Sequence, residues 1–104
     1  NSKPSYHLMI LLIDFSKLKI DKSRLIRMLM KYNIYCQFHY IPIYKFSKFN
    51  AKNLSLYPNS KKYFNNALSI PIYYNLKFSE VKYISNTIKK ILLLNLKTKS
   101  KLRL

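Results

Sequence analysis

The sequence contains no glycine and no tryptophan, and Cys36 is its one cysteine among 104 residues. Without glycine, the glycine-rich loops that cradle phosphate in many nucleotide-binding proteins cannot form in their usual way. A single thiol makes neither an internal disulfide nor a multi-cysteine metal site. Because Cys36 lies among apolar residues, we expect it to be buried and to pack as a small hydrophobic side chain.

Acidic residues are almost as scarce. Asp14, Asp21 and Glu80 are the three carboxylates, and they lie far apart in the chain. A pair of carboxylates for acid–base catalysis is therefore not expected. The two histidines, His7 and His39, have no Cys or Asp at metal-ligand spacing, so a zinc site is not expected either. The residues alone do not predict a self-contained catalyst.

Long apolar runs are also missing. The longest, residues 8–13, is far shorter than the ~20 residues of a membrane span, and no signal peptide starts at Asn1. We expect a soluble, cytoplasmic protein without a membrane partner. Its length predicts one domain, residues 1–96, followed by a basic, frayed tail at 97–104.

Basic residues dominate the charge, which is formally +17. Such a charge favours binding to nucleic acid. However, only 3 of the 20 basic residues are arginine, and they are spread along the whole chain. The wealth of Lys, Asn, Ile, Tyr and Phe is also typical of an AT-rich genome, so codon bias and a selected basic surface both remain open. In either case we expect non-specific, salt-dependent binding to polyanions.

The hydrophobic pattern predicts an α+β fold, with a small sheet of about three strands and about three helices packed on it. The predicted strands are residues 6–13, 34–40 and 69–73, the helices are 21–32, 60–68 and 79–94, and residues 42–58 form a long loop with room for a helical turn. The first strand, being apolar throughout, is expected to be buried on both faces.

Local chemistry sets several helix boundaries. Asp21 is a good N-cap for the first helix, and Asn33 can close it in the left-handed conformation that glycine usually adopts. Asn75 is typical of a turn. Two core-facing sets follow from helical spacing: Leu25, Ile26, Leu29 and Met30 in the first helix, and Val81, Ile84, Ile88 and Ile91 in the last.

The segment 34–40 alternates between two kinds of side chain. Ile34, Cys36, Phe38 and Tyr40 point one way, and Tyr35, Gln37 and His39 point the other. A His and a Tyr that leave a strand can donate hydrogen bonds to a phosphate, a sugar hydroxyl or a carbonyl. The alternative is that both are satisfied residues at a sheet edge. The candidate site is the cluster Gln37, His39, Tyr40, Pro42 and Tyr44.

Four stretches, in one order over residues 4–94, resemble the DegT/DnrJ/EryC1/StrS aminotransferase family. Residues 37–44, Gln-Phe-His-Tyr-Ile-Pro-Ile-Tyr, are similar to its Val-His-Tyr-Ile-Pro signature. Residues 58–73 resemble its block ending Leu-Ser-Leu-Pro-Leu-Tyr, while 5–8 and 76–91 are similar to its opening strand and closing helix. Tyr44 and Gln37 look most like the UDP-4-amino-4,6-dideoxy-N-acetyl-altrosamine transaminase branch.

The resemblance implies the C-terminal small domain of a homodimeric, fold type I aminotransferase. In that family a large domain holds pyridoxal phosphate on a lysine, and an amino group passes, typically from glutamate, to a keto-sugar nucleotide. The residues expected to line the substrate pocket are Gln37, His39, Tyr40, Ile41, Pro42 and Tyr44. No Lys here matches the catalytic motif, so the chain alone is expected to hold neither cofactor nor metal and to be inactive.

The sequence departs from the family pattern at three positions. Asn33 and Asn75 stand where the family usually has Gly, and Lys77 stands where a Thr usually caps the last helix. Two other functions remain as alternatives. A small basic nucleic-acid-binding module would place Lys and aromatic side chains on one shared face. An orphan scaffold or decayed fragment would have no activity.

Overall fold

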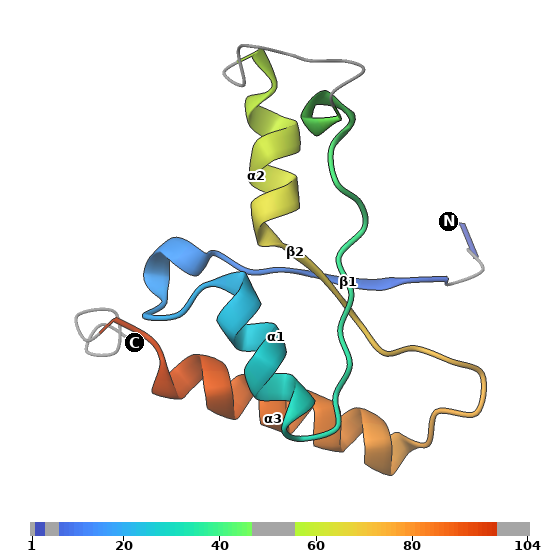
Figure 1. The fold of residues 1–104 in the computed structure, drawn as a ribbon. Coiled ribbons are helices and arrows are strands. Elements are labelled where there is room, and N and C mark those ends of the chain that lie inside the picture. The colour runs from blue at the N-terminus through green and yellow to red at the C-terminus, as the bar shows by residue number, and fades with distance from the viewer. Residues whose placement is uncertain (1, 4–6, 47–55, 98–104) are drawn as a thin grey trace.

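The computed structural model describes residues 2–3, 7–46 and 56–97. These residues form a two-stranded antiparallel sheet and three α-helices (Figure 1). The elements are β1 (Met9–Leu12), α1 (Lys22–Met30), α2 (Pro58–Asn66), β2 (Ala67–Ile70) and α3 (Phe78–Leu94), with short 3₁₀ turns at Phe15–Lys17 and Ile43–Lys45. The predicted α+β class and the three helices are confirmed, and the sheet has fewer strands than expected.

The strand predicted at 34–40 is not formed. This segment is extended but meets β2 at a single bridge, where Gln37 N donates to Ser69 O (2.9 Å) and Ser69 N donates to Gln37 O (2.7 Å). Figure 1 shows the segment crossing the line of β2 and continuing toward the far end of α2. Phe38 packs edge-on against Phe64 of α2, with ring centroids 6.0 Å apart. After this one pair of backbone hydrogen bonds the segment leaves the sheet and packs against α2.

The first strand is shorter and more exposed than predicted. β1 pairs with β2 in the register Met9 opposite Ile70 to Leu12 opposite Ala67. Leu11 packs against the core, but Met9 and Ile10 are exposed and Leu12 is 68% exposed. The prediction of burial on both faces is therefore wrong, because Met9 on the core face and Ile10 and Leu12 on the other face are left exposed by the described chain.

Helix α1 begins as predicted and ends slightly early. The Asp21 carboxylate accepts a hydrogen bond from Arg24 N (2.7 Å), which confirms the N-cap. Asn33 has a φ of 60°, as expected for the residue that closes the helix. Leu25 and Leu29 are fully buried, whereas Met30 is exposed, so the predicted apolar face is correct only in part.

Helix α2 starts at Pro58 and ends at Asn66, two residues before the predicted end. Ala67 and Leu68, expected in the helix, instead begin β2 and are buried opposite β1. Pairing with Leu12 and Leu11 outweighs their helical propensity, because strand pairing buries both side chains. The predicted strand at 69–73 thus lies at Ala67–Ile70.

Helix α3 spans Phe78–Leu94, one residue longer than predicted. Ile84, Ile88 and Ile91 face the core as expected, but Val81 is exposed, and that part of the prediction is wrong. The Glu80 carboxylate accepts from Lys77 N (2.8 Å), while the Lys77 side chain makes no capping bond. Leu76 N donates to Tyr73 O (3.1 Å) and confirms the turn around Asn75.

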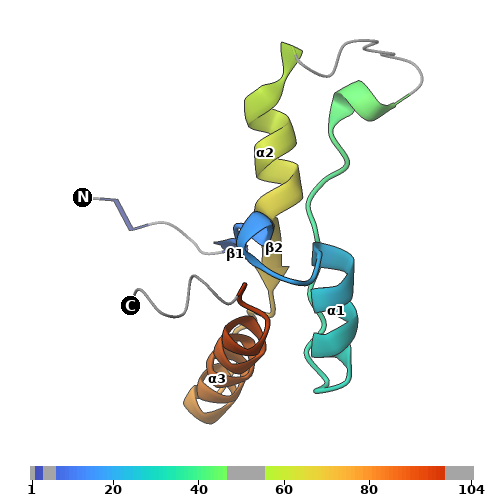
Figure 2. The same cartoon turned by 90° about the vertical axis from the view of Figure 1, so that its left-hand side faces the viewer.

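The core lies between α1, α3 and one face of the β1–β2 pair, and α2 extends from the opposite side (Figures 1 and 2). It consists of the buried side chains Ile13, Leu18, Leu25, Leu29, Ile34, Leu68, Ile84, Ile88 and Ile91. Lys97, expected to begin a frayed tail, is instead paired, since Lys97 N donates to Lys17 O (3.1 Å). Residues 98–104 of that predicted tail lie outside the described part, in which no helix is long and apolar enough to cross a membrane.

Candidate functional site

The polar face predicted for segment 34–40 opens onto one small pocket of about 250 Å³, here called the histidine pocket. Tyr35, Gln37 and His39 contribute alternate side chains from this segment. The other lining residues come from the chain before β1, from β2 and from the segment after it: His7, Leu8, Ser69, Ile70, Pro71, Ile72 and Tyr73. Alternation thus brings the three polar residues together although they do not form a regular strand.

A side-chain hydrogen bond fixes His39 within this pocket. His39 Nδ1 lies 3.1 Å from Ser69 Oγ, and Ser69 is only 7% exposed. The backbone bridge between Gln37 and Ser69 lies two residues earlier on the same segment, so it sets the distance at which His39 reaches Ser69. The Tyr40 ring meets the His39 ring edge-on at 4.6 Å between centroids.

The other predicted site residues divide between different surroundings. Tyr40 and Pro42 share a second pocket of about 380 Å³ with His39 and with Asn59, Ser60, Tyr63 and Phe64 of α2. Tyr40 itself is 74% exposed. Ile41 is exposed and lines neither pocket. Tyr44 lies in the 3₁₀ turn, and its side chain is outside the part that the structure describes.

Sequence reasoning missed four polar residues of the histidine pocket: His7, Tyr35, Ser69 and Tyr73. Ser69 and Tyr73 belong to the block 58–73 that resembles the family, but nothing local shows that they face His39. Their contact with the site depends on the pairing of Gln37 with Ser69, which joins residues distant in sequence. Tyr35 could have been predicted as a site residue from the sequence, since it shares the alternating face with Gln37 and His39.

Lys22, the first residue of α1, lies in an aromatic cluster beside the end of α2. Its ammonium group donates to Phe64 O and to Ala67 O (3.4 Å), and lies 4.4 Å from the centroid of the Phe64 ring and 5.3 Å from that of Phe38. Lys45 Nζ lies 4.7 Å from the Phe64 centroid. Burial lowers the pKa of Lys22, and the positive charge of Lys45 lowers it further.

This environment resembles that of a reactive lysine, since burial favours the neutral amine that such chemistry needs. The hydrogen bonds give Lys22 a different task. Its ammonium satisfies carbonyls at the C-terminal end of α2, where a cation is favourable. Lys22 is also absent from the lining of the histidine pocket. We therefore assign it a structural role that joins α1 to α2.

Each carboxylate of the chain already has a local partner. Asp14 accepts hydrogen bonds from Ser16, which lower its pKa, and Asp21 caps α1. Glu80 accepts from Lys77 N and from Tyr73 Oη (3.3 Å). The pKa of Tyr73 is raised, first by desolvation and then by the Glu80 charge. Within the described ranges, no three His, Cys, Asp or Glu side chains gather where they could bind a metal.

The described residues do not fit pyridoxal phosphate. That cofactor needs a lysine that can form a Schiff base and a carboxylate at its pyridine nitrogen. Lys22, whose pKa is lowered, is bonded to backbone carbonyls, and the carboxylates of Asp14, Asp21 and Glu80 are engaged. The histidine pocket, in contrast, presents uncharged polar groups from Tyr, Gln, His and Ser, which suit a neutral or anionic ligand rich in oxygen.

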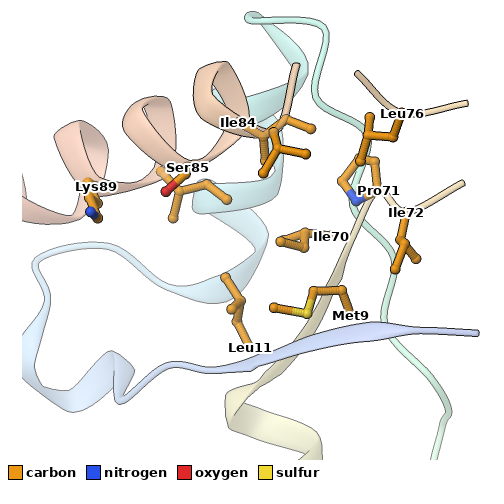
Figure 3. Close-up of a pocket in the computed structure, with 11 residues that line it drawn as sticks. Met9, Leu11, Ile70, Pro71, Ile72, Leu76, Ile84, Ser85 and Lys89 are labelled. Carbon is orange, nitrogen blue, oxygen red and sulfur yellow. The ribbon is translucent and has the colours of Figure 1, made fainter. Parts of the chain in front are cut away.

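An apolar groove of about 460 Å³ lies between the strand pair and α3 (Figure 3). Met9 and Leu11 of β1 point from the sheet toward the helix in this view. Its lining is almost wholly apolar: Met9, Leu11, Ile70, Pro71, Ile72, Leu76, Val81, Ile84 and Ile88, with Ser85 and Lys89 at the helix. The described chain leaves Met9, Ile72 and Val81 of this lining exposed.

The fold is similar to part of one solved structure. The structure resembles Helicobacter pylori PseC, an aminotransferase involved in the biosynthesis of pseudoaminic acid, with a TM-score of 0.68 and 23% sequence identity. The match covers 82% of this chain and 23% of PseC. At this identity the likeness shows the fold.

Two relatives match at the level of sequence. Protein MJ1066 of Methanocaldococcus jannaschii, which is uncharacterized, is 32% identical over 93 residues, covering 86% of this chain and 24% of that protein. The spore coat polysaccharide biosynthesis protein SpsC of Bacillus subtilis (strain 168) is 27% identical over 96 residues, covering 88% and 24%. The chain therefore spans about a quarter of the length of these relatives.

The family itself follows from the match to a family model, which covers most of the chain. The sequence pattern of the DegT/DnrJ/EryC1/StrS aminotransferase family fits residues 1–89, which include both motifs first noted, at 37–44 and 58–73. The histidine pocket lies where these two motifs meet, through the bridge between Gln37 and Ser69. The chain belongs to the DegT/DnrJ/EryC1/StrS aminotransferase family.

Proposed function

We propose that this chain is the C-terminal small-domain part of a pyridoxal phosphate-dependent transaminase acting on a nucleotide-sugar. The acceptor is a 4-keto-6-deoxy sugar, the amino donor is glutamate, and the product serves the synthesis of surface polysaccharide or glycoprotein sugars. Family membership supports the transaminase class. SpsC, a spore coat polysaccharide biosynthesis protein, and PseC, involved in pseudoaminic acid biosynthesis, support the sugar class.

The observation that carries the proposal is the composition of the histidine pocket. Tyr35, Gln37 and His39 offer hydrogen-bond donors, and no carboxylate lines the pocket. Sugar hydroxyls, a keto oxygen and phosphate oxygens all accept hydrogen bonds. Such a ligand would satisfy these donors without bringing its negative charge against an acidic residue. Gln37, His39, Tyr40, Ile41, Pro42 and Tyr44 remain the proposed substrate-binding residues, with Tyr35 and Tyr73 added.

We assign the cofactor to another part of the enzyme, because the described residues do not fit it. In this division, a large domain holds pyridoxal phosphate, which supplies the electron sink for amino transfer. This chain binds the sugar, orients it and excludes water. The apolar groove and the exposed side of β1 are surfaces of the kind that a neighbouring domain or a second subunit covers. A cytoplasmic homodimer is part of the same proposal.

The alternative function, a nucleic-acid-binding module, requires basic and aromatic side chains on one open face. Lys22, Lys45, Phe38 and Phe64 do lie together. However, the Lys22 ammonium is bonded to backbone carbonyls and stacks on its own aromatic neighbours. This cluster therefore ties the domain together, and it leaves little of its charge for a phosphate backbone.

The decisive experiment first sequences the DNA upstream of the codon for Asn1. The proposal expects the reading frame to continue into a large domain that carries a cofactor lysine. A start codon directly before Asn1 would exclude catalysis by this chain, and a salt-dependent polyanion-binding assay would then test the alternative.

The second step changes His39→Ala in the complete enzyme. The KM for the nucleotide-sugar should rise, while the absorbance of the bound cofactor stays unchanged, because His39 is placed in the sugar site. Tyr74→Ala is the matched control, since Tyr74 is fully exposed at the turn and lines neither pocket. Loss of the cofactor absorbance in the His39→Ala enzyme would show that His39 has been given the wrong role.

A further inference from the structure

The bond between His39 and Ser69 restricts where the proton of the imidazole ring lies. His39 Nδ1 and Ser69 Oγ are 3.1 Å apart, and within the described residues neither group has another side-chain hydrogen bond. Each of the two atoms is able to donate or to accept. The direction of the bond decides whether the neutral ring carries its proton on Nδ1 or on Nε2, and therefore what the ring offers to a ligand.

Burial of the serine favours one direction. If Nδ1 carried the proton, it would donate a hydrogen bond to the Ser69 hydroxyl oxygen. The hydrogen of the Ser69 hydroxyl would then need another acceptor. Ser69 is only 7% exposed, and the described residues give its hydroxyl no side-chain hydrogen-bond partner other than His39. A buried hydroxyl without an acceptor is unfavourable. If Ser69 donates to Nδ1 instead, both groups are satisfied, and the ring proton is on Nε2.

We propose that Ser69 is a positioning residue for His39: its hydroxyl donates to Nδ1 and so presents Nε2–H to the ligand as a hydrogen-bond donor. The identity of that ligand as a nucleotide-sugar rests on the proposed function, but the direction of the bond does not. A donor at Nε2 suits a keto, hydroxyl or phosphate oxygen. A ring with its proton on Nδ1 would present a bare nitrogen lone pair, which repels a keto or phosphate oxygen.

The framework around the pair explains why a serine at this position is able to do this. Ser69 lies in β2, where it is held by β1 on one side, opposite Ile10, and by the Gln37 bridge on the other. His39, in contrast, lies on a segment with one backbone bridge, so its ring depends on a side-chain contact for its orientation. Because Ser69 is held in the strand pair, its hydrogen bond holds the His39 ring in one orientation.

The test begins with the wild-type chain of 104 residues, labelled with ¹⁵N-histidine. Two-bond ¹H–¹⁵N correlation spectra at pH 8.5, where a histidine ring of ordinary pKa is neutral, distinguish the two forms. Dispersed amide resonances verify that the chain is folded. We expect His39 with its proton on Nε2 and an unprotonated, hydrogen-bonded Nδ1. A proton on Nδ1 would overturn the proposal, and this measurement needs no variant.

The second arm uses Ser69→Ala and Ser69→Thr in the complete enzyme. Ser69→Ala should raise the KM for the nucleotide-sugar by about 3- to 10-fold, as expected for one hydrogen bond, with a smaller change in kcat. Ser69→Thr, which keeps a hydroxyl, should restore KM to within about twofold. Ser23→Ala, an exposed serine of α1, is the matched control and should change neither.

The two failures are distinguishable. If the wild-type enzyme transfers no amino group to any nucleotide-sugar, the proposed function fails, and the spectra still decide the direction of the bond. If the enzyme is active but Ser69→Ala leaves KM unchanged, Ser69 does not position His39. If Ser69→Thr behaves like Ser69→Ala while amide spectra show both variants folded, the hydroxyl is not the group that matters, and the proposal is likewise overturned.

Discussion

At Asn33, substitution by glycine should destabilise the protein less than substitution by alanine. This order is the reverse of the one expected for an asparagine inside a helix. It has a φ of 60°, in the left-handed region, at the end of α1. Asn33 N donates to Met30 O (3.0 Å), and Ile34 N donates to Leu29 O (3.0 Å). These two bonds form a Schellman-type helix end, in which the residue at this position is usually glycine. Ile34 and Leu29, the outer pair of this motif, both belong to the buried core.

The expected magnitude follows from two opposing effects. An alanine with left-handed dihedrals is destabilised by about 1–2 kcal/mol through its Cβ atom. Glycine avoids this clash but loses about 0.5–1 kcal/mol more backbone entropy on folding. At position 33 the glycine variant should therefore be more stable than the alanine variant by about 1 kcal/mol. Asn86, exposed in the middle of α3, is the control. There the alanine variant should be the more stable, by about 0.8–1.0 kcal/mol.

Urea and thermal unfolding, followed by circular dichroism, would compare Asn33→Gly, Asn33→Ala, Asn86→Gly and Asn86→Ala. A difference of 1 kcal/mol corresponds to roughly 4–8 °C in Tm for a domain of this size. The reasoning is refuted if alanine is at least as stable as glycine at position 33. It is also refuted if the two positions rank the substitutions in the same order, because the left-handed dihedral would then not determine the outcome.

Two further predictions concern the core and the thiol. Leu29→Ala, at a side chain that is 0% exposed, should lower the unfolding free energy by about 2–5 kcal/mol. Leu93→Ala, at 55% exposure, should change the unfolding free energy by less than about 1 kcal/mol in the same urea titration. Equal losses in the two variants would contradict the assigned core. Burial raises the pKa of Cys36 to about 11 from 9.0, so the folded chain should react far more slowly with a disulfide reagent at pH 8 than the unfolded chain. The unfolding free energy of the chain should also fall as pH rises from about 9 to about 11, because the unfolded state releases the thiol proton first. This pH dependence should be absent from Cys36→Ala. If it persists in that variant, groups other than Cys36 cause it.

The local signals predicted helix ends better than strand positions. Asp21 and Asn33 act on the nearest turn of backbone, so their side chains and dihedrals determine where α1 begins and closes. Ala67 and Leu68 were assigned to a helix because their spacing continues that of α2. Their actual state is decided by β1, more than 50 residues earlier in the chain. No window of sequence around Ala67 contains that information.

The exposure of β1 shows a second limit. An apolar strand predicts that its side chains are buried, but it does not identify what buries them. In this structure Leu11 packs against the core, while Leu12 and Met9 are exposed. The chain spans about a quarter of its relatives' length. An apolar strand that the described chain leaves partly exposed is therefore consistent with the proposal that this domain works against a larger body.

The candidate site combines both kinds of information. The alternation of Tyr35, Gln37 and His39 was visible in the sequence, and it persists in an extended segment that has only one bridge to the sheet. Ser69 was not visible, because it is brought to His39 by that same bridge. A regular third strand would have fixed this segment by a ladder of backbone bonds. With a single bridge, the orientation of the His39 ring depends on a side-chain contact, and Ser69, which lies 30 residues later in the chain, supplies that contact.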